Sequence, residues 1–146
     1  MTTITANSEG IASDSGLVHN GTISAITAKK IFRVKGYLIG VCGRCACYEE
    51  LIYTLKEAEE DPIKHLTTVD EPERDCDALI LSPEGVIWRY DGHGIPYKHP
   101  ESYATSGSGS TVALAAMMAG AGPREAVKIA IALDPQSNGK PKYVKL

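Results

Sequence analysis

The chain has 146 residues, of which 43% are hydrophobic and 23% charged, and its formal net charge at pH 7 is −3. This length suits one domain, residues 1–146, with a core that folds without disulfides or a structural metal. The small negative charge argues against nucleic acid or an anionic membrane surface as the main partner. Because the sequence has neither a membrane-spanning apolar run nor a signal-peptide pattern, we expect a cytoplasmic protein.

The first third of the chain is predicted to form β-strands. Short β-forming runs alternate with turn-forming clusters, at residues 7–10 and at His19-Asn20-Gly21, which is the pattern of hairpins. A strand over residues 29–34 is followed by the tight turn at residues 35–36. Residues 37–42 are continuously apolar, so we expect them to form a central, buried strand.

The middle of the chain changes from strand patterns to a helical one. Residues 45–60 place apolar side chains at helical spacing, with charged residues between them, which predicts one amphipathic helix. Asp61-Pro62 is predicted to end this helix. Residues 63–77 are charged and have little periodicity, so they are predicted to form a loop.

The second half is predicted to add three strands, two helices and a last strand. The strands are expected over residues 78–81, 86–90 and 102–105. A helix of small residues is expected over 111–119, and a second helix from Pro123 to Leu133, with Pro123 at its first position. Residues 143–146 complete the chain as a strand. Runs of strands and runs of helices in this order predict an α+β fold.

Three cysteines, Cys42, Cys45 and Cys47, lie within six residues, and Cys76 stands alone. Such crowding can indicate a zinc or redox site. A structural zinc site needs four ligands, so Cys76 or a histidine from a distant segment would have to complete it. The other interpretation is small buried thiols in a tightly packed turn. We favour that interpretation and predict no metal and no cofactor.

Thr2 is a candidate nucleophile. A threonine hydroxyl needs a base beside it, and an N-terminal threonine carries its own base. The pKa of a free α-amino group is ordinarily about 7.7–8.0, close to physiological pH. Met-Thr is a sequence from which the initiator methionine is normally removed, so Thr2 can become the first residue.

Five motifs occur in a fixed order along the chain, and the first begins at Thr2. They are Thr2-Thr3-Ile4 with Gly10 and Asp14-Ser15, then Lys29-Lys30-Ile31, the apolar run 38–43 ending at Gly43, Gly107-Ser108-Gly109-Ser110, and Asp134-Pro135-Gln136-Ser137-Asn138-Gly139. With these motifs the chain resembles the proteasome β-subunits and HslV, which are N-terminal nucleophile hydrolases, and it is similar to compact bacterial or phage members of that family. The resemblance covers nearly the whole chain.

The resemblance implies a role for each matching residue. Thr2 would attack a carbonyl carbon, and its amine, helped by Ser108, Asp134 and Ser137, would move the proton. Lys30 would lie beside the nucleophile, with Asp14 holding it in place. The backbone N–H of Gly43 would face the oxyanion. The side chains of Val41 and Cys45 would line the pocket for the residue before the cleaved bond and favour apolar side chains.

The resemblance also implies a four-layer αββα sandwich. The chain is shorter than the family norm, and the missing part lies between Glu60 and Cys76, where a second long helix is usual. We therefore expect a shortened first helical layer. Gly16 stands where arginine is frequent, and Cys47 where an acidic residue is common, so the sequence departs from the family pattern at both positions.

These features predict a threonine endopeptidase that acts on peptides or unfolded proteins. The family encloses such sites, so we expect a homo-oligomeric ring, and any ATP-driven unfolding would need a separate ATPase, because the chain has no phosphate-binding loop. Three alternatives remain open: an amidohydrolase acting on a small-molecule amide, a catalytically silent relative with a structural or interaction role, and a small zinc-binding module.

Overall fold

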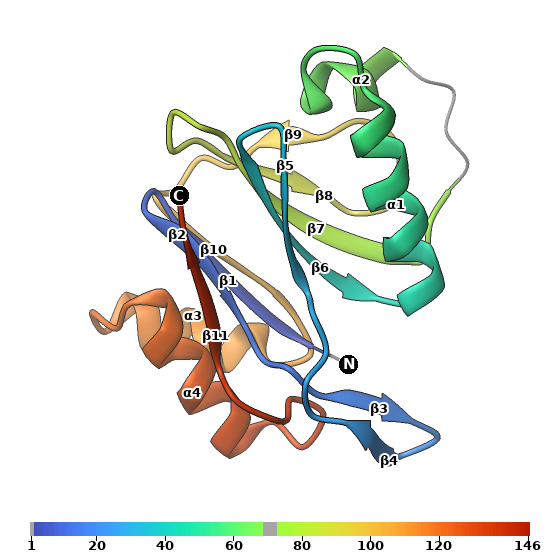
Figure 1. Cartoon of the computed structure of the whole chain (residues 1–146). Coiled ribbons are helices and arrows are strands. Elements are labelled where there is room, and N and C mark those ends of the chain that lie inside the picture. Colours follow the sequence, from blue (N-terminus) through green and yellow to red (C-terminus); the bar gives the residue numbers. More distant parts are fainter. Residues whose placement is uncertain (1, 69–72) are drawn as a thin grey trace.

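The computed structural model describes residues 2–68 and 73–146, and in this part of the chain the main strands form two antiparallel sheets (Figure 1). The four-stranded sheet has the order β10-β1-β2-β11 and the five-stranded sheet the order β5-β6-β7-β8-β9. The strands of the first sheet are β1 (Thr3–Asn7), β2 (Gly10–Ser13), β10 (Tyr103–Gly107) and β11 (Lys142–Lys145). Those of the second are β5 (Ile31–Val34), β6 (Tyr37–Gly43), β7 (Cys76–Leu81), β8 (Ile87–Tyr90) and β9 (Tyr97–Lys98). A separate hairpin pairs β3 (Leu17–His19) with β4 (Thr22–Ala25).

Helices cover the outer faces of the two stacked sheets. Helix α1 (Cys45–Glu57) packs on β5, β6 and β7, and α2 (Pro62–Thr68) packs beside α1. On the other side, α3 (Ser110–Met118) and α4 (Pro123–Leu133) cover β1, β2 and β10. Figure 1 shows the resulting order of layers, helices, sheet, sheet, helices. The expected αββα sandwich is confirmed, and because α2 has 7 residues, its first helical layer is short.

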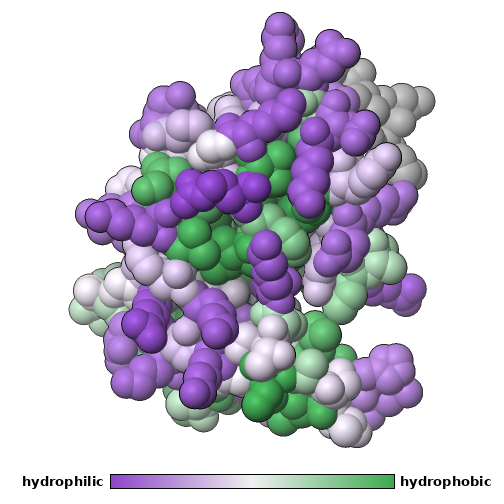
Figure 2. All heavy atoms as spheres, viewed as in Figure 1, coloured by the Kyte–Doolittle hydropathy of each residue, from purple (hydrophilic) through white to green (hydrophobic). Residues whose placement is uncertain are grey.

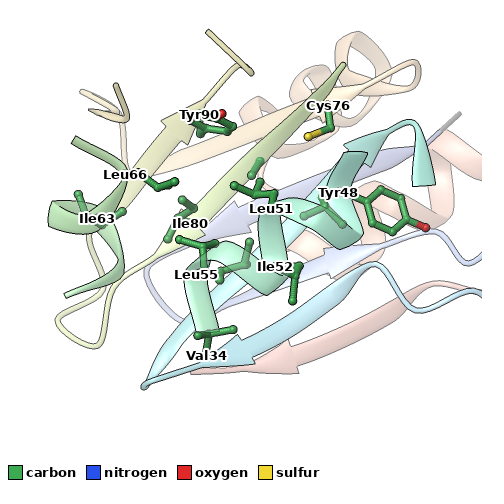
Figure 3. Packing of buried hydrophobic residues seen from close by; sticks show 13 residues of the cluster. Val34, Tyr48, Leu51, Ile52, Leu55, Ile63, Leu66, Cys76, Ile80 and Tyr90 are labelled. Atoms are coloured by element: carbon green, nitrogen blue, oxygen red, sulfur yellow. The ribbon is translucent and has the colours of Figure 1, made fainter. Parts of the chain in front are cut away.

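The sheets and the first helical layer are held by two apolar clusters. One lies between α1, α2 and the five-stranded sheet, where Figure 3 shows Leu51, Ile52 and Leu55 of α1 packed toward Val34 and Ile80. The other lies between the two sheets, around Ile4, Ile11, Leu38 and Leu79. Side chains alternate along β6, so Ile39 and Val41 belong to the helix-facing cluster, whereas Leu38 and Cys42 belong to the cluster between the sheets.

A glycine sets how closely the sheets approach each other. A Cβ atom at position 40 of β6 would lie 2.6 Å from Cγ2 of Ile4 and 2.9 Å from Cγ2 of Ile11. A side chain there would force the sheets apart, because packed cores leave few voids larger than a water molecule. Strand β6 is thus covered on both faces, and the structure confirms the central, buried strand that its apolar run predicts.

The predicted loop over residues 63–77 is wrong for its first part, because α2 begins at Pro62. Proline suits the first position of a helix, where its missing N–H is not needed. The carboxylate of Asp61 accepts the backbone N–H of Ile63 at 2.8 Å, which caps this helix. Ile63 and Leu66 are buried against α1, so tertiary packing stabilises a helix that the charged sequence conceals. Residues 69–72 lie outside the described part.

Two small elements are not predicted as strands by the sequence. The β3–β4 pair is recognisable only through its turn, where Asn20 and Gly21 both have positive φ angles of 49° and 74°. Strand β9 has two residues and no pattern to reveal it. Figure 2 shows apolar surface at the lower right of the view, where the β3–β4 hairpin lies, and Ile23 and Ile26 are 50% and 58% exposed. In the described part, no helix is long and apolar enough to cross a membrane.

The packing of α1 yields a testable prediction. Leu51 is fully buried in the helix-facing cluster, whereas Tyr53 on the same helix is 66% exposed. We expect Leu51→Ala to lower the free energy of unfolding by roughly 2–5 kcal/mol because it leaves a cavity. Tyr53→Ala should change it by less than about 0.5 kcal/mol. Urea denaturation followed by circular dichroism measures both, and equal losses would contradict the assigned packing.

Candidate active site

The candidate site is a cavity of about 800 Å³ at the end of the sandwich where β1 begins and β6 ends. Thr2 lies in its wall, directly before β1. The cavity is lined from β6 and the start of α1, from the hairpin, from β7 and β8, and from the turn after β10. These lining residues include Val18, His19, Cys42, Gly43, Arg44, Cys45, Asp75, Asp77, Arg89, Ser106 and Ser108.

The hydroxyl of Thr2 contacts a buried ion pair. The Nζ atom of Lys30 donates to Oγ1 of Thr2 at 2.8 Å and to Oδ1 of Asp14 at 2.9 Å. The side chains of Lys30 and Asp14 have no exposed surface, and Thr2 is 4% exposed. Burial lowers the pKa of Lys30, while Asp14 opposes this effect by stabilising the ammonium form.

Asp14 is held by backbone groups from both ends of the chain. Its carboxylate accepts the N–H of Thr3 at 3.0 Å, that of Asn138 at 3.0 Å and that of Gly16 at 3.4 Å. The pairing of β1 with β2 brings Asp14 beside Thr3, because the N–H of Asp14 donates to the carbonyl of Thr3 at 3.1 Å. The local fold therefore aims this carboxylate at Lys30.

A second polar group lies beside the backbone of Thr2. The hydroxyls of Ser108 and Ser137 both donate to Oδ2 of Asp134, at 2.7 Å and 2.6 Å. Asp134 is the C-cap of α4. Partial burial raises the pKa of its carboxyl, but the hydrogen bonds from Ser137, Ser108 and the N–H of Gln136 lower it by more. The net effect is a pKa below the usual value. The hydroxyl of Ser108 also lies 3.3 Å from the carbonyl oxygen of Thr2.

The backbone N–H of Gly43 faces the same side of β6 as Lys30. Along this strand the N–H of Val41 donates to the carbonyl of Lys30 at 2.9 Å, and that of Arg44 donates to the carbonyl of Asp75 on the other side at 3.0 Å. Successive N–H groups of a strand alternate between its two neighbours, so the N–H of Gly43 points as Val41 does, past the beginning of β5. Gly43 has φ +110°, and a Cβ there would lie 2.6 Å from the carbonyl oxygen of Asp75.

The structure brings together most of the residues singled out in the sequence. Residues from five segments gather around Thr2, namely Asp14, Lys30, Gly43, Ser108, and Asp134 with Ser137. Cys45, at the start of α1, lines the cavity and is exposed, and its sulfur accepts the hydroxyl of Tyr48 at 3.2 Å.

The placement of Val41 in the pocket wall needs correction. Its side chain is fully buried in the cluster under α1, so it faces away from the cavity. Cys42, the next residue of β6, lines the cavity in its place and contacts the hydroxyl of Ser106 at 3.3 Å. The alternation of side chains along a strand predicts this placement. Gly40 and Cys42 face the other sheet, so Val41 between them faces the helices.

Several cavity residues have no signal in the sequence. Asp77 lies opposite Cys42 in the β6–β7 ladder, and Arg89 of β8 donates to the carbonyl of Thr105 at 3.2 Å. Val18 and His19 reach the cavity from the hairpin. Such positions depend on long-range strand pairing, which a single sequence does not reveal. Among the described residues, no group of three or more His, Cys, Asp or Glu side chains is placed to hold a metal ion.

No protein-family model matches the sequence, and no curated protein matches it. Among solved structures, HslV of Trypanosoma brucei superposes with a TM-score of 0.80 at 21% identity, over 99% of this chain and 98% of that chain. BPH of Thiobacillus denitrificans, a bacterial proteasome homologue, superposes with a TM-score of 0.79 at 19% identity, over 99% of this chain and 97% of that chain.

The same BPH has also been solved in complex with epoxomicin, and that structure gives a TM-score of 0.77 at 19% identity, over 99% of this chain and 97% of that chain. At these identities the superpositions establish the fold, and they do so over nearly the whole length of both chains. The chain therefore has the proteasome β/HslV fold of the N-terminal nucleophile hydrolases, as the sequence motifs predict.

The cysteines give a prediction that checks this geometry without a substrate. Cys45 is exposed, whereas burial raises the pKa of Cys42 to about 11 and that of Cys76 to about 12. Because only thiolates react readily, we expect N-ethylmaleimide to modify Cys45 in the native protein and to spare Cys42 and Cys76. Peptide mass mapping locates the adducts, and Cys45→Ser is the control. Modification of Cys42 before Cys45 would contradict the placement of β6.

Proposed function

We propose that the chain is a threonine endopeptidase whose nucleophile is Thr2 after removal of Met1. The observation that carries this proposal is the direct hydrogen bond from the buried Lys30 ammonium to the hydroxyl of Thr2, in the wall of a cavity of about 800 Å³. A buried cation beside a hydroxyl favours its ionised form, which is the reactive nucleophile. Asp14 keeps the lysine charged and oriented.

The base in this proposal is the α-amino group of Thr2. Ser108 supports that role through its single hydrogen, because its hydroxyl lies 2.7 Å from the carboxylate of Asp134 and 3.3 Å from the carbonyl of Thr2. The hydrogen goes to the nearer, charged acceptor. The oxygen of Ser108 then has lone pairs that can accept an N–H of the amine and orient it.

The reaction follows from these positions. Oγ1 of Thr2 attacks the carbonyl carbon of the peptide bond while the amine takes the hydroxyl proton. The N–H of Gly43 faces the resulting oxyanion, and one such donor typically contributes about 2.7–4 kcal/mol. The C–N bond breaks when the amine returns the proton to the leaving nitrogen, which leaves an ester on Thr2. Water, deprotonated by the same amine, hydrolyses this ester and restores Thr2.

The substrate in this proposal is a peptide or unfolded protein. The thiols of Cys42 and Cys45 make part of the cavity wall small and weakly polar, which favours an apolar side chain before the cleaved bond. Arg44 and Asp75 at the rim form an ion pair at 2.9 Å and so neutralise each other. A chain of either charge can therefore approach this part of the rim.

Enclosure in a homo-oligomeric ring is part of the proposal, with the chain as one domain over residues 1–146 in the cytoplasm. The outer helical face supports association, because Leu114, Met118 and Leu133 are 38%, 70% and 68% exposed on α3 and α4. Exposed large apolar side chains of this kind are a feature of interaction surfaces. A separate ATPase would supply unfolded chains to such an assembly.

An amidohydrolase acting on a small molecule is the second candidate. The cavity of about 800 Å³ lies within the range of roughly 300–1,000 Å³ that is typical of small-molecule sites, and this observation favours it. Analytical ultracentrifugation separates the two candidates, since a ring supports the peptidase and a monomer or dimer supports the amidase. Retention of Met1 in the mature protein would leave only a non-catalytic role.

The nucleophile gives the first functional prediction. Thr2→Ala should abolish hydrolysis of fluorogenic peptide amides with an apolar residue before the cleaved bond, because no hydroxyl remains. Thr22→Ala is the matched control, since Thr22 is exposed on the hairpin strand β4, and it should retain wild-type turnover. Intact mass must first show that each chain begins at residue 2. Undiminished turnover by the Thr2→Ala protein would refute the assignment.

The buried ion pair gives the second prediction. Lys30→Met and Asp14→Asn should each lower the free energy of unfolding by about 3–5 kcal/mol, because each leaves an uncompensated buried charge. The double variant removes both charges and should regain much of this loss. Peptidase activity should stay absent in all three proteins, since the cation beside Thr2 is gone or misplaced. Activity in the double variant would show that Lys30 supports folding alone.

A further inference from the structure

Thr3 contacts both polar groups that flank Thr2. Its backbone N–H donates to Oδ1 of Asp14 at 3.0 Å, the same oxygen that binds Lys30. Its side-chain oxygen lies 2.6 Å from the hydroxyl oxygen of Ser137. Thr3 is fully buried and Ser137 is 1% exposed, so this contact is shielded from solvent.

Counting hydrogens fixes the direction of the contact between Thr3 and Ser137. A serine hydroxyl has one hydrogen, and that of Ser137 is donated to the carboxylate of Asp134 at 2.6 Å. The hydrogen between the two hydroxyl oxygens therefore comes from Thr3. The result is a chain of donors from Thr3 to Ser137 to Asp134, which Ser108 joins from the other side.

The surroundings of this chain are built tightly around it. A Cβ atom at Gly109 would lie 2.0 Å from Oγ1 of Thr3 and 3.2 Å from Oγ of Ser137. Glycine at position 109 therefore lets the backbone close directly over the two hydroxyls. Hydrogen bonds in such a dry setting polarise one another, so a donor at one end strengthens the bond at the other.

We propose that Thr3 is a positioning residue that joins the Lys30–Asp14 pair to the Ser108–Asp134–Ser137 group and so sets the proton-transfer geometry at Thr2. This inference rests on the proposed function for its effect on rate, while its structural part stands on the hydrogen-bond chain alone. By donating to Ser137, Thr3 strengthens the bond that Asp134 accepts. Asp134 in turn orients Ser108, the partner assigned to the amine.

Several groups shift the pKa of Asp134, and Thr3 acts on it through only one of them, Ser137. Burial raises the pKa of this carboxyl, whereas the hydrogen bonds from Ser137, Ser108 and the N–H of Gln136 lower it. Removing the hydroxyl of Thr3 weakens one of these contributions and leaves the others. The pKa of Asp134 should therefore rise.

The test uses Thr3→Val, which keeps the shape and the backbone N–H but removes the hydroxyl, and Thr3→Ser, which restores it. Thr5→Val is the matched control, because Thr5 lies on the same face of β1, is fully buried and donates to the carbonyl of Pro123 at 3.0 Å. Thr5 is absent from the donor chain. Both valine variants lose one buried hydroxyl and should lose similar thermal stability.

Two measurements on the full chain separate the outcomes. Carboxyl ¹³C NMR should show a higher pKa of Asp134 in Thr3→Val, and wild-type values in Thr3→Ser and Thr5→Val. The rate of Thr2 modification by epoxomicin should fall about tenfold in Thr3→Val alone, with its acid limb moved to higher pH. An unchanged Asp134 titration in Thr3→Val, or an equal shift in Thr5→Val, would overturn the inference.

The two measurements test different proposals. If epoxomicin does not modify the wild-type chain, the proposed peptidase is wrong. The NMR titration still decides whether Thr3 acts on Asp134. Should Thr3→Val not fold, the wild-type protein provides a direct observation. The hydroxyl proton of Thr3 should exchange slowly with water and show a nuclear Overhauser effect to Ser137. Rapid exchange of this proton would equally overturn the inference.

Discussion

The structure around Thr2 depends on the buried carboxylate of Asp14. It accepts Nζ of Lys30 and the backbone N–H groups of Thr3 and Asn138, and so ties together β1, the segment before β5 and the loop before β11. A buried charge is costly unless it is paired and hydrogen-bonded. Here each of these hydrogen bonds also joins Asp14 to another segment of the fold. The strands cannot shift relative to one another without leaving this charge unsatisfied. That constraint keeps the ammonium of Lys30 against the hydroxyl of Thr2.

Glycine allows close approach at two points around this arrangement. Gly107 has φ +93°, and a Cβ there would lie 1.9 Å from the carbonyl oxygen of Thr2. Gly40 permits the two sheets to approach over Ile4 and Ile11. Close approach of the sheets brings Asp14 and Lys30, which adjoin different sheets, within hydrogen-bond distance. The apolar core and the polar site therefore depend on each other. Packing of the core excludes water from the ion pair, and the lower dielectric constant strengthens its attraction.

Much of this arrangement is predictable from the sequence. The helical spacing of Leu51, Ile52 and Leu55 and the continuously apolar strand β6 identify the two elements that build the helix-facing core. Ordered motifs, rather than periodicity, identify the fold and single out Asp14, Lys30 and Ser108. What the sequence conceals is set by tertiary contacts. Helix α2 is stabilised by burial of Ile63 and Leu66 against α1. The side chain of Val41 faces away from the cavity because side chains alternate between the two faces of β6. Asp77 and Arg89 reach the cavity through strand pairing between distant segments.

The central claim is that the first residue of the mature chain is a nucleophilic threonine. The most direct test is the mass of the N-terminal peptide before and after incubation with epoxomicin, the compound found in complex with the structurally similar BPH. We predict a chain that begins at Thr2 and gains one epoxomicin on that residue. A chain that begins at Thr2 and remains unmodified, under conditions in which BPH binds epoxomicin, would contradict it.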